Sequence, residues 1–135
     1  MTMADGSSAQ ALLHIDWILV VSAAWLLVGA AGVAALRRLA FVARVLFPLG
    51  GALGLVLFLL AVSALGNTPE VAVLPIGLPS LPFHLRLDSL AAYFLMVIGA
   101  ASAGISVFAA GYFRKGEGTP PGLLCLEYHV FLASM

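Results

Sequence analysis

Charged residues are scarce in this chain, and their scarcity decides its class. Asp, Glu, Lys and Arg make up only 9% of the 135 residues, whereas an ordinary soluble domain carries about 25%. The composition therefore excludes a typical soluble globular protein. Six basic residues balance six acidic ones, so the formal net charge is zero. A nucleic-acid partner would need a clustered basic face, and we expect none.

Cysteine and the usual signatures of catalysis are also nearly absent. Cys125 is the single cysteine, so an intrachain disulfide or a cysteine-based metal site is excluded. The sequence has no glycine-rich phosphate loop and no nucleophile with a neighbouring base. We therefore expect no catalytic residue, no metal site and no cofactor within this chain.

Long apolar runs are abundant instead, since 63% of the residues are hydrophobic. Crossing a bilayer core takes about 20 helical residues, and the uncharged runs at 17–36, 45–65 and 89–113 are long enough. A fourth run, 123–135, is too short to span by itself and indicates the start of an interrupted helix. No basic residue except His14 precedes the first run, which favours a retained helix over a cleavable signal.

These runs predict an all-α membrane protein with three complete transmembrane helices and the start of a fourth. The expected segments alternate between helices and connections. They are an external tail at 1–14, helix 15–36, a cytoplasmic loop at 37–44, helix 45–65, an external loop at 66–88, helix 89–113, a cytoplasmic loop at 114–122, and the truncated helix 123–135.

The basic residues predict the orientation of these helices. Five of the six fall in the loops on one side of the three spans: Arg37, Arg38, Arg44, Arg114 and Lys115. By the positive-inside rule that side is cytoplasmic. The N-terminus is then external, and the expected location is the inner (plasma) membrane, with the lipid bilayer as the surrounding partner.

The external loop at 66–88 is the least helical part of the sequence. It contains four prolines, and its stretches "VAVLP" and "FHLRL" have the β-branched and alternating patterns of short strands. We predict a small β-hairpin here. Gly66 and Asn67 before it are a helix-stop signal.

Small residues four apart predict where the helices pack, because they allow backbones to approach closely in a membrane. Such pairs occur in all three spans. They are Ala30 with Ala34, Gly50 with Gly54, Gly99 with Ala103, and Ala100 with Gly104 on a second face. Pro48 is predicted to lie harmlessly in the first turn of the second span.

Ionisable residues inside a bilayer usually mark function, and the three complete runs hold none. Glu127, in the fourth segment, is therefore the candidate for an ion pathway. His129 lies two residues further on, so on a helix it points elsewhere and does not form a metal pair with Glu127. Asp16 and Asp88 each precede an apolar helix, and Asp88 is expected to cap its helix by accepting the N–H of Leu90 or Ala91.

The C-terminal half resembles a known family. The start "LRLDSLAAYF", the close "VFAAGYFRKG" and the following "YHVFLASM" resemble the third- and fourth-helix region of antiporter-like subunits. These subunits are shared by respiratory complex I, Mrp-type sodium/proton antiporters and energy-converting hydrogenases. The sequence looks most similar to the hydrogenase-4 component B and formate hydrogenlyase branch.

The resemblance implies the N-terminal part of a subunit that moves H⁺ or Na⁺ in a hydrogenase or complex-I-like assembly, whose other membrane subunits are the implied partners. It implies a role in a membrane oxidoreductase complex with no catalytic site in this chain. Asp88 is the family's structural marker here, and the family's ion-carrying residues lie in later helices. The alternative interpretation is a small three-span structural or accessory protein without transport activity.

Overall fold

Four helical segments dominate the computed structural model, which describes residues 13–78, 81–112 and 120–135. The three long helices are α1 (His14–Ala34), a continuous helix Leu39–Ala64, and α4 (Ser89–Tyr112). Each is long and apolar enough to cross a membrane, as predicted. A shorter helix, α5 (Pro121–Ser134), follows. Residues 1–12 of the predicted tail at 1–14 lie outside the described residues, as does the basic pair Arg114 and Lys115, and the last residue of that tail, His14, already belongs to α1.

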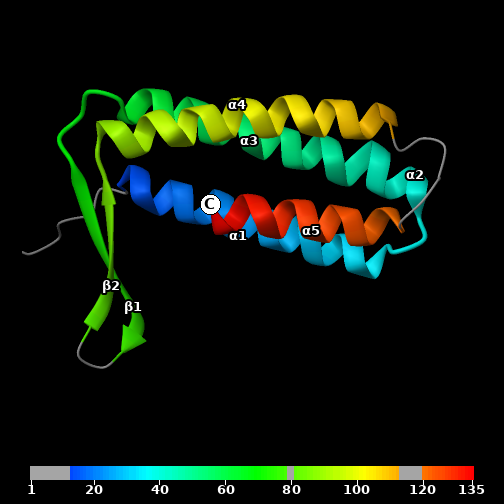
Figure 1. Cartoon of the computed structure of the whole chain (residues 1–135), viewed down its shortest axis with the longest axis horizontal. Helices are drawn as coiled ribbons and strands as arrows, with labels where there is room; N and C mark the ends of the chain where they lie inside the picture. The colour runs from blue at the N-terminus through cyan, green and yellow to red at the C-terminus, as the bar shows by residue number, and fades with distance from the viewer. Residues whose placement is uncertain (1–12, 79–80, 113–119) are drawn as a thin grey trace, which may run out of the picture.

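The helices form two packed pairs. α3, the Phe47–Ala64 part of the continuous helix, lies beside α4, and α1 lies beside α5 (Figure 1). The chain runs up and down through the bundle. One end of the bundle, which we call the hairpin end, holds the start of α1, the end of α3 and the start of α4. The opposite end holds the α1–α2 turn with Arg37 and Arg38, and we call it the arginine end.

The predicted hairpin is confirmed. β1 (Glu70–Leu78) pairs antiparallel with β2 (Leu81–Leu87), from Glu70 opposite Leu87 to Leu78 opposite Leu81, with an irregularity between Leu74 and Gly77. The predicted stop before it is also present, because α3 ends at Ala64 and Gly66 adopts φ +83°, a conformation that glycine takes without strain. The hairpin lies across one end of the bundle (Figure 1).

The second long helix begins at Leu39, six residues before the predicted start of the span at residue 45. It consists of α2 (Leu39–Phe41), a π-helical turn η1 (Val42–Leu46) and α3. Pro48 lies in the first turn of α3, as predicted, but that turn is not a free helix end, because η1 and α2 continue the helix before it. A proline there removes a hydrogen-bond donor, and the wide turn directly before it is where the helix absorbs that loss.

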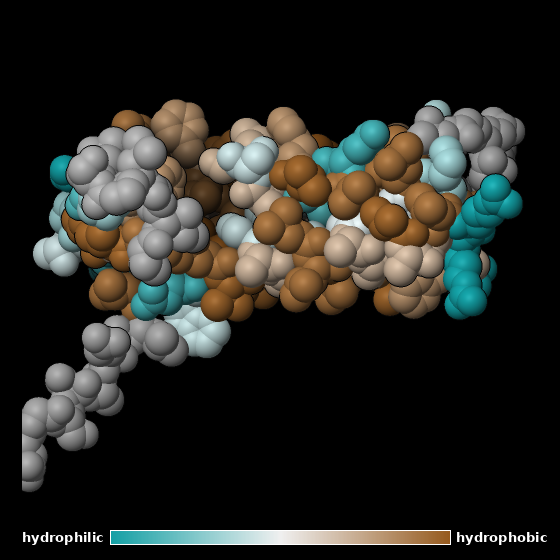
Figure 2. Space-filling model, turned by 90° about the horizontal axis from the view of Figure 1, so that it is seen from below, coloured by the Kyte–Doolittle hydropathy of each residue, from teal (hydrophilic) through white to brown (hydrophobic). Residues whose placement is uncertain are grey.

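The interior is filled by three apolar clusters stacked along the bundle. The cluster at the hairpin end joins Ile15, Ala64, Leu87 and Ala92, and further clusters surround Trp25 and Cys125. The outside is apolar as well. Figure 2 shows hydrophobic residues over most of the visible side of the bundle, with hydrophilic residues gathered mainly toward its ends. This distribution suits a helix bundle whose sides face lipid.

Glycines set the closest approaches between helices. A Cβ on Gly99 of α4 would lie 2.6 Å from Phe58 N and 2.8 Å from Gly54 O, so residues from two of the predicted small-residue pairs, Gly54 and Gly99, lie at a helix contact. In α1 the predicted face is wrong, since Ala30 and Ala34 are exposed. The contact with α5 uses Gly29 and Gly32, which are three residues apart and lie one turn apart on the buried side.

Candidate functional site

Asp88 has the capping role that the sequence predicts. Its Oδ1 accepts the backbone N–H of Ala91 at 2.9 Å, in the first turn of α4. Its other oxygen lies 3.8 Å from Arg86 Nε, at the outer limit of an ion pair. Both interactions are local and at the end of a helix, so they position the start of α4 and do not place Asp88 in an interior ion path.

A second polar contact at the hairpin end joins residues that the sequence does not connect. His14 Nδ1–H donates to Glu70 Oε1 at 2.8 Å, and the Ile15 N–H donates to Glu70 Oε2 at 3.2 Å. Glu70 therefore ties β1 to the first turn of α1. Asp16 supports the same turn, because its Oδ2 accepts the Leu13 N–H at 3.1 Å.

The charge of Glu70 contributes to stability in a pH-dependent way. Burial opposes ionisation of this carboxyl, but hydrogen bonds from His14 and Ile15 outweigh it, and its pKa lies below the usual value. The pKa of a Glu carboxyl in the unfolded chain is about 4.3, and the pKa of Glu70 in the folded chain is lower. The charge of Glu70 therefore stabilises the fold fully above about pH 4.3, and this stabilisation is lost as the pH falls through the folded pKa.

We expect Glu70→Gln to lower the free energy of unfolding by about 1 kcal/mol at pH 7 and by much less at pH 3. Thermal unfolding in detergent, followed by helical circular dichroism at both pH values, measures the difference. Glu127→Gln is the matched control, since Glu127 is exposed. An equal effect of Glu70→Gln at the two pH values would contradict the ion-pair interpretation.

Glu127, the candidate for an ion pathway, faces outward from α5. Its side chain is exposed, whereas Cys125 and His129 on either side of it point into the bundle. Glu127 therefore does not meet the polar residues of the interior. It lies six residues from the start of α5, about 9 Å along the helix axis.

The interior holds a polar group that sequence reasoning missed, His129. The imidazole is completely buried among α1, α3 and α5, and its Nδ1 lies 2.7 Å from the Cys125 carbonyl oxygen. A carbonyl only accepts, so Nδ1 carries the proton and Nε2 of the neutral ring has a lone pair. Among the described residues, that Nε2 is a buried side-chain polar atom without a hydrogen-bond partner.

Gly50 of α3 makes the space for this ring. Any Cβ at position 50 would overlap His129 Nε2, so the imidazole lies directly against the α3 backbone. The lone pair therefore faces the glycine Cα, where a C–H group offers a weak interaction at most. On the other side, Trp25 Nε1–H donates to the Gly50 carbonyl oxygen at 3.2 Å. Gly50 is thus the meeting point of α1, α3 and α5.

Hydroxyl groups form a second polar contact between α4 and α5. Tyr128 Oη donates to the Ser102 carbonyl oxygen at 3.0 Å, which leaves the Ser106 hydroxyl to donate to Tyr128 Oη at 3.2 Å. The buried Ser102 hydroxyl donates to the Gly99 carbonyl oxygen at 2.9 Å. The two bonds of Tyr128 join α4 and α5, the Ser102–Gly99 bond lies within α4, and none of the three places a fixed charge in the interior.

The interior groups are not arranged for nucleophilic or metal chemistry. Cys125 Sγ lies 3.5 Å from His129 Nδ1, but that nitrogen already donates to the Cys125 carbonyl and does not act as a base for the thiol. No group of three possible metal ligands occurs within the described part of the chain. What the arrangement provides is specific packing of helices through buried polar groups.

Three apolar helices of transmembrane length and an up-and-down bundle with largely apolar sides define a helical membrane protein as the class that fits this chain. Comparison with protein-family models, curated proteins and solved structures finds no match to this chain.

Proposed function

We propose that this chain is the N-terminal part of an antiporter-like membrane subunit that couples translocation of H⁺ or Na⁺ to electron transfer in a hydrogenase, formate hydrogenlyase or complex-I-like assembly. The order of its parts supports the proposal: a hairpin, the Asp88-capped start of an apolar helix, and then α5 with "YHVFLASM". The arginine end is then cytoplasmic, and the N-terminus is on the external side of the plasma membrane.

The outward position of Glu127 is the observation that most favours a larger assembly. A carboxylate facing hydrocarbon is costly, by about 2.5–3.5 kcal/mol at a helix centre, and such groups normally face protein or water. α5 packs within a bundle whose sides are apolar, yet Glu127 is exposed on it. A neighbouring subunit or helix with a polar or basic partner would remove this cost.

A face of α4 supports the same conclusion. Ala100, Gly104 and Gly111 are exposed, and a Cβ on either glycine would meet nothing within 4 Å. Their spacings of four and seven place them on one side of the helix. Small residues on a membrane helix typically permit close approach of another helix. The predicted second face, Ala100 with Gly104, is thus open for a neighbour.

Purification of the tagged chain from native membranes tests the proposal. We expect membrane subunits of a hydrogenase or quinone reductase to copurify, and Gly104→Leu to reduce their recovery while the isolated chain stays folded. Leu59→Phe, on the exposed side of α3, is the matched control that should leave recovery unchanged. Recovery of no such subunit, or equal recovery with Gly104→Leu, would count against an antiporter-like assembly.

A structural or accessory role is the second candidate, and one observation favours it. Residues 17–34, 47–64 and 89–112 of the three long helices include no Asp, Glu, Lys or Arg. An ion path normally requires titratable groups near the middle of the membrane. In the purification above, an accessory protein would bring down partners unrelated to redox or antiporter complexes.

A further inference from the structure

The charges of the bundle are divided unequally between its two ends. Of the four carboxylates in the described part of the chain, Asp16, Glu70 and Asp88 lie at the hairpin end. Both ion pairs found among the described residues are at that end as well. The fourth carboxylate, Glu127, takes part in neither pair. Within the part of the chain that the structure describes, the positive charge of the arginine end is therefore not neutralised by an ion pair.

Three guanidinium groups belong to the arginine end. Arg37 and Arg38 lie in the turn between α1 and α2, Arg44 lies in η1, and all three are exposed. Arg44 is six residues after Arg38, about 9 Å along the helix axis. Long side chains on a helix lean toward its N-terminus, so Arg44 extends back toward the turn that holds the other two. The three positive charges therefore face the same end of the bundle.

A shallow hollow of about 150 Å³ lies beside Arg44. It is also lined by Leu39, Ala40 and Ala43, so it lies against the beginning of the second long helix. The small side chains of Ala40 and Ala43 leave this space open. Its volume is well below the range of about 300–1,000 Å³ that is typical of small-molecule sites. The hollow therefore suits one small charged group beside a guanidinium and not a whole cofactor.

Exposed apolar side chains adjoin these arginines. Leu36, Phe41 and Val45 are 41–45% exposed, and each is next to an arginine or within three residues of one. A soluble anion would meet the guanidinium groups and leave this apolar surface uncovered. A phospholipid meets both, because guanidinium binds phosphate oxygens with two hydrogen bonds and acyl chains cover apolar side chains. The ends of membrane-spanning helices lie at the level of lipid headgroups, where such a molecule is present.

We propose that the arginine end binds one anionic phospholipid, with its phosphate in the hollow beside Arg44 and within reach of Arg37 and Arg38. Its acyl chains lie along the apolar side chains of Phe41 and Val45. The positive charge without an ion-pair partner and the adjoining apolar surface together select this occupant. The site requires a bundle that spans a bilayer and is independent of the proposed function.

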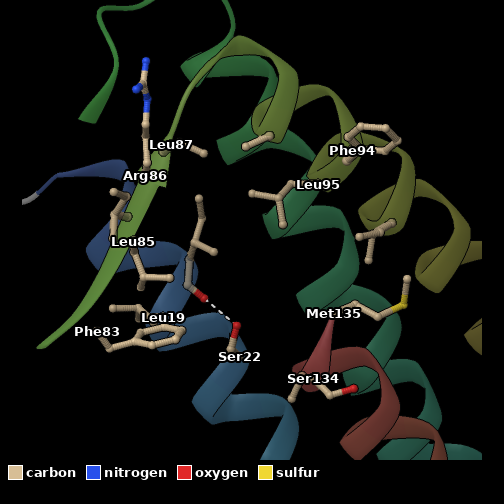
Figure 3. A pocket seen from close by; sticks show the side chains of 15 residues that line it. Leu19, Ser22, Phe83, Leu85, Arg86, Leu87, Phe94, Leu95, Ser134 and Met135 are labelled. Carbon is tan, nitrogen blue, oxygen red and sulfur yellow. Dashed lines mark hydrogen bonds between the residues drawn. The ribbon is translucent and has the colours of Figure 1, made fainter. Parts of the chain in front are cut away.

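Native mass spectrometry of the full chain tests the site. The chain is reconstituted in vesicles of equal parts dioleoyl-phosphatidylglycerol and dioleoyl-phosphatidylcholine and then extracted in mild detergent. We expect one phosphatidylglycerol per chain to be retained in preference to phosphatidylcholine. Arg44→Gln should lower this preference about fivefold, the effect of one cation near an anionic membrane surface. Arg86→Gln removes the same charge from β2, where the side chain extends away from the apolar residues beside it (Figure 3), and should keep the preference.

Ala40→Leu tests the hollow without changing a charge. It fills the space beside Arg44 and should lower the preference about threefold, because the phosphate moves away from the guanidinium. Ala101→Leu, at an exposed position of α4, is the matched control that should keep it. Circular dichroism verifies that each variant is folded, and the double variant Arg37→Gln with Arg38→Gln replaces Arg44→Gln if the latter unfolds.

The source of the phosphate is tested on the extracted complex. Inorganic phosphate should displace no more phosphatidylglycerol than sodium chloride does at equal ionic strength. Greater displacement would mean that the site takes phosphate alone, and the assignment to a lipid would be wrong. The proposal is also overturned if the unmodified chain retains the two lipids equally, if Arg44→Gln and Arg86→Gln have the same effect, or if Ala40→Leu retains as much as Ala101→Leu.

Discussion

Gly99→Leu should lower the free energy of unfolding by about 3 kcal/mol, a loss at the upper end for overpacked cores. The new side chain would start 2.6 Å from Phe58 N and 2.8 Å from Gly54 O. Both atoms belong to the α3 backbone, which does not yield as the end of a flexible side chain does. α3 and α4 would have to separate along the surface where they pack against each other.

Gly104→Leu in the same helix is the matched control. It brings the same gain in helix propensity, somewhat less than the ~0.8–1.0 kcal/mol that separates glycine from alanine, and its Cβ meets nothing within 4 Å. Unfolding by titration with a denaturing detergent in mixed micelles measures both variants. Similar free energies for the two would mean that α3 and α4 do not meet at Gly54 and Gly99.

Gly50→Ala should cost about 2 kcal/mol, because its methyl group would occupy the place of the His129 ring. The ring has little room to move, since its Cβ packs against Gly29 of α1 and its Nδ1 is bonded to the Cys125 carbonyl. His129→Ala alone should also destabilise the bundle, through the cavity that it leaves.

The double variant distinguishes this contact from general damage. With His129→Ala present, the methyl group of Gly50→Ala enters vacated space, so the two substitutions together should cost at least about 1 kcal/mol less than their sum. Gly50→Ala combined with Leu87→Ala, in the separate cluster at the hairpin end, is the control pair and should be additive within about 0.5 kcal/mol. Additivity in the His129 pair as well would refute the contact.

The parts of the fold that could be predicted are those determined by local pattern. Uncharged runs marked the long helices, Gly66 marked the end of α3, and Asp88 marked the cap of α4. The contact face of α1 could not be predicted, because it contains small residues at several spacings. Ala30 with Ala34 and Gly29 with Gly32 are equally plausible until α5 supplies the neighbour.

The polar contacts depend on residues far apart in the chain. His14 and Glu70 are 56 positions apart and meet only because the hairpin returns to the start of α1. His129 lies in a short segment whose sequence does not show a clear polar face, and its burial follows from the pairing of α5 with α1. Its spacing of four from Cys125 is the available signal, since it places the two residues on one side of a helix.

The wide turn before Pro48 makes this part of the chain respond unequally to insertions and deletions. Val42 and Phe47 are both buried in one cluster, although five residues of α-helix would turn them about 140° apart. The π-type bond from Phe47 N–H to the Val42 carbonyl oxygen widens the turn, so that Val42 and Phe47 lie on the same buried side of the helix. Removing the exposed Arg44 would leave Val42 and Phe47 four positions apart. In a regular α-helix, residues at that spacing lie within about 40° of each other around the axis. Adding a residue would turn Val42 toward lipid, so evolution can shorten this segment more readily than lengthen it.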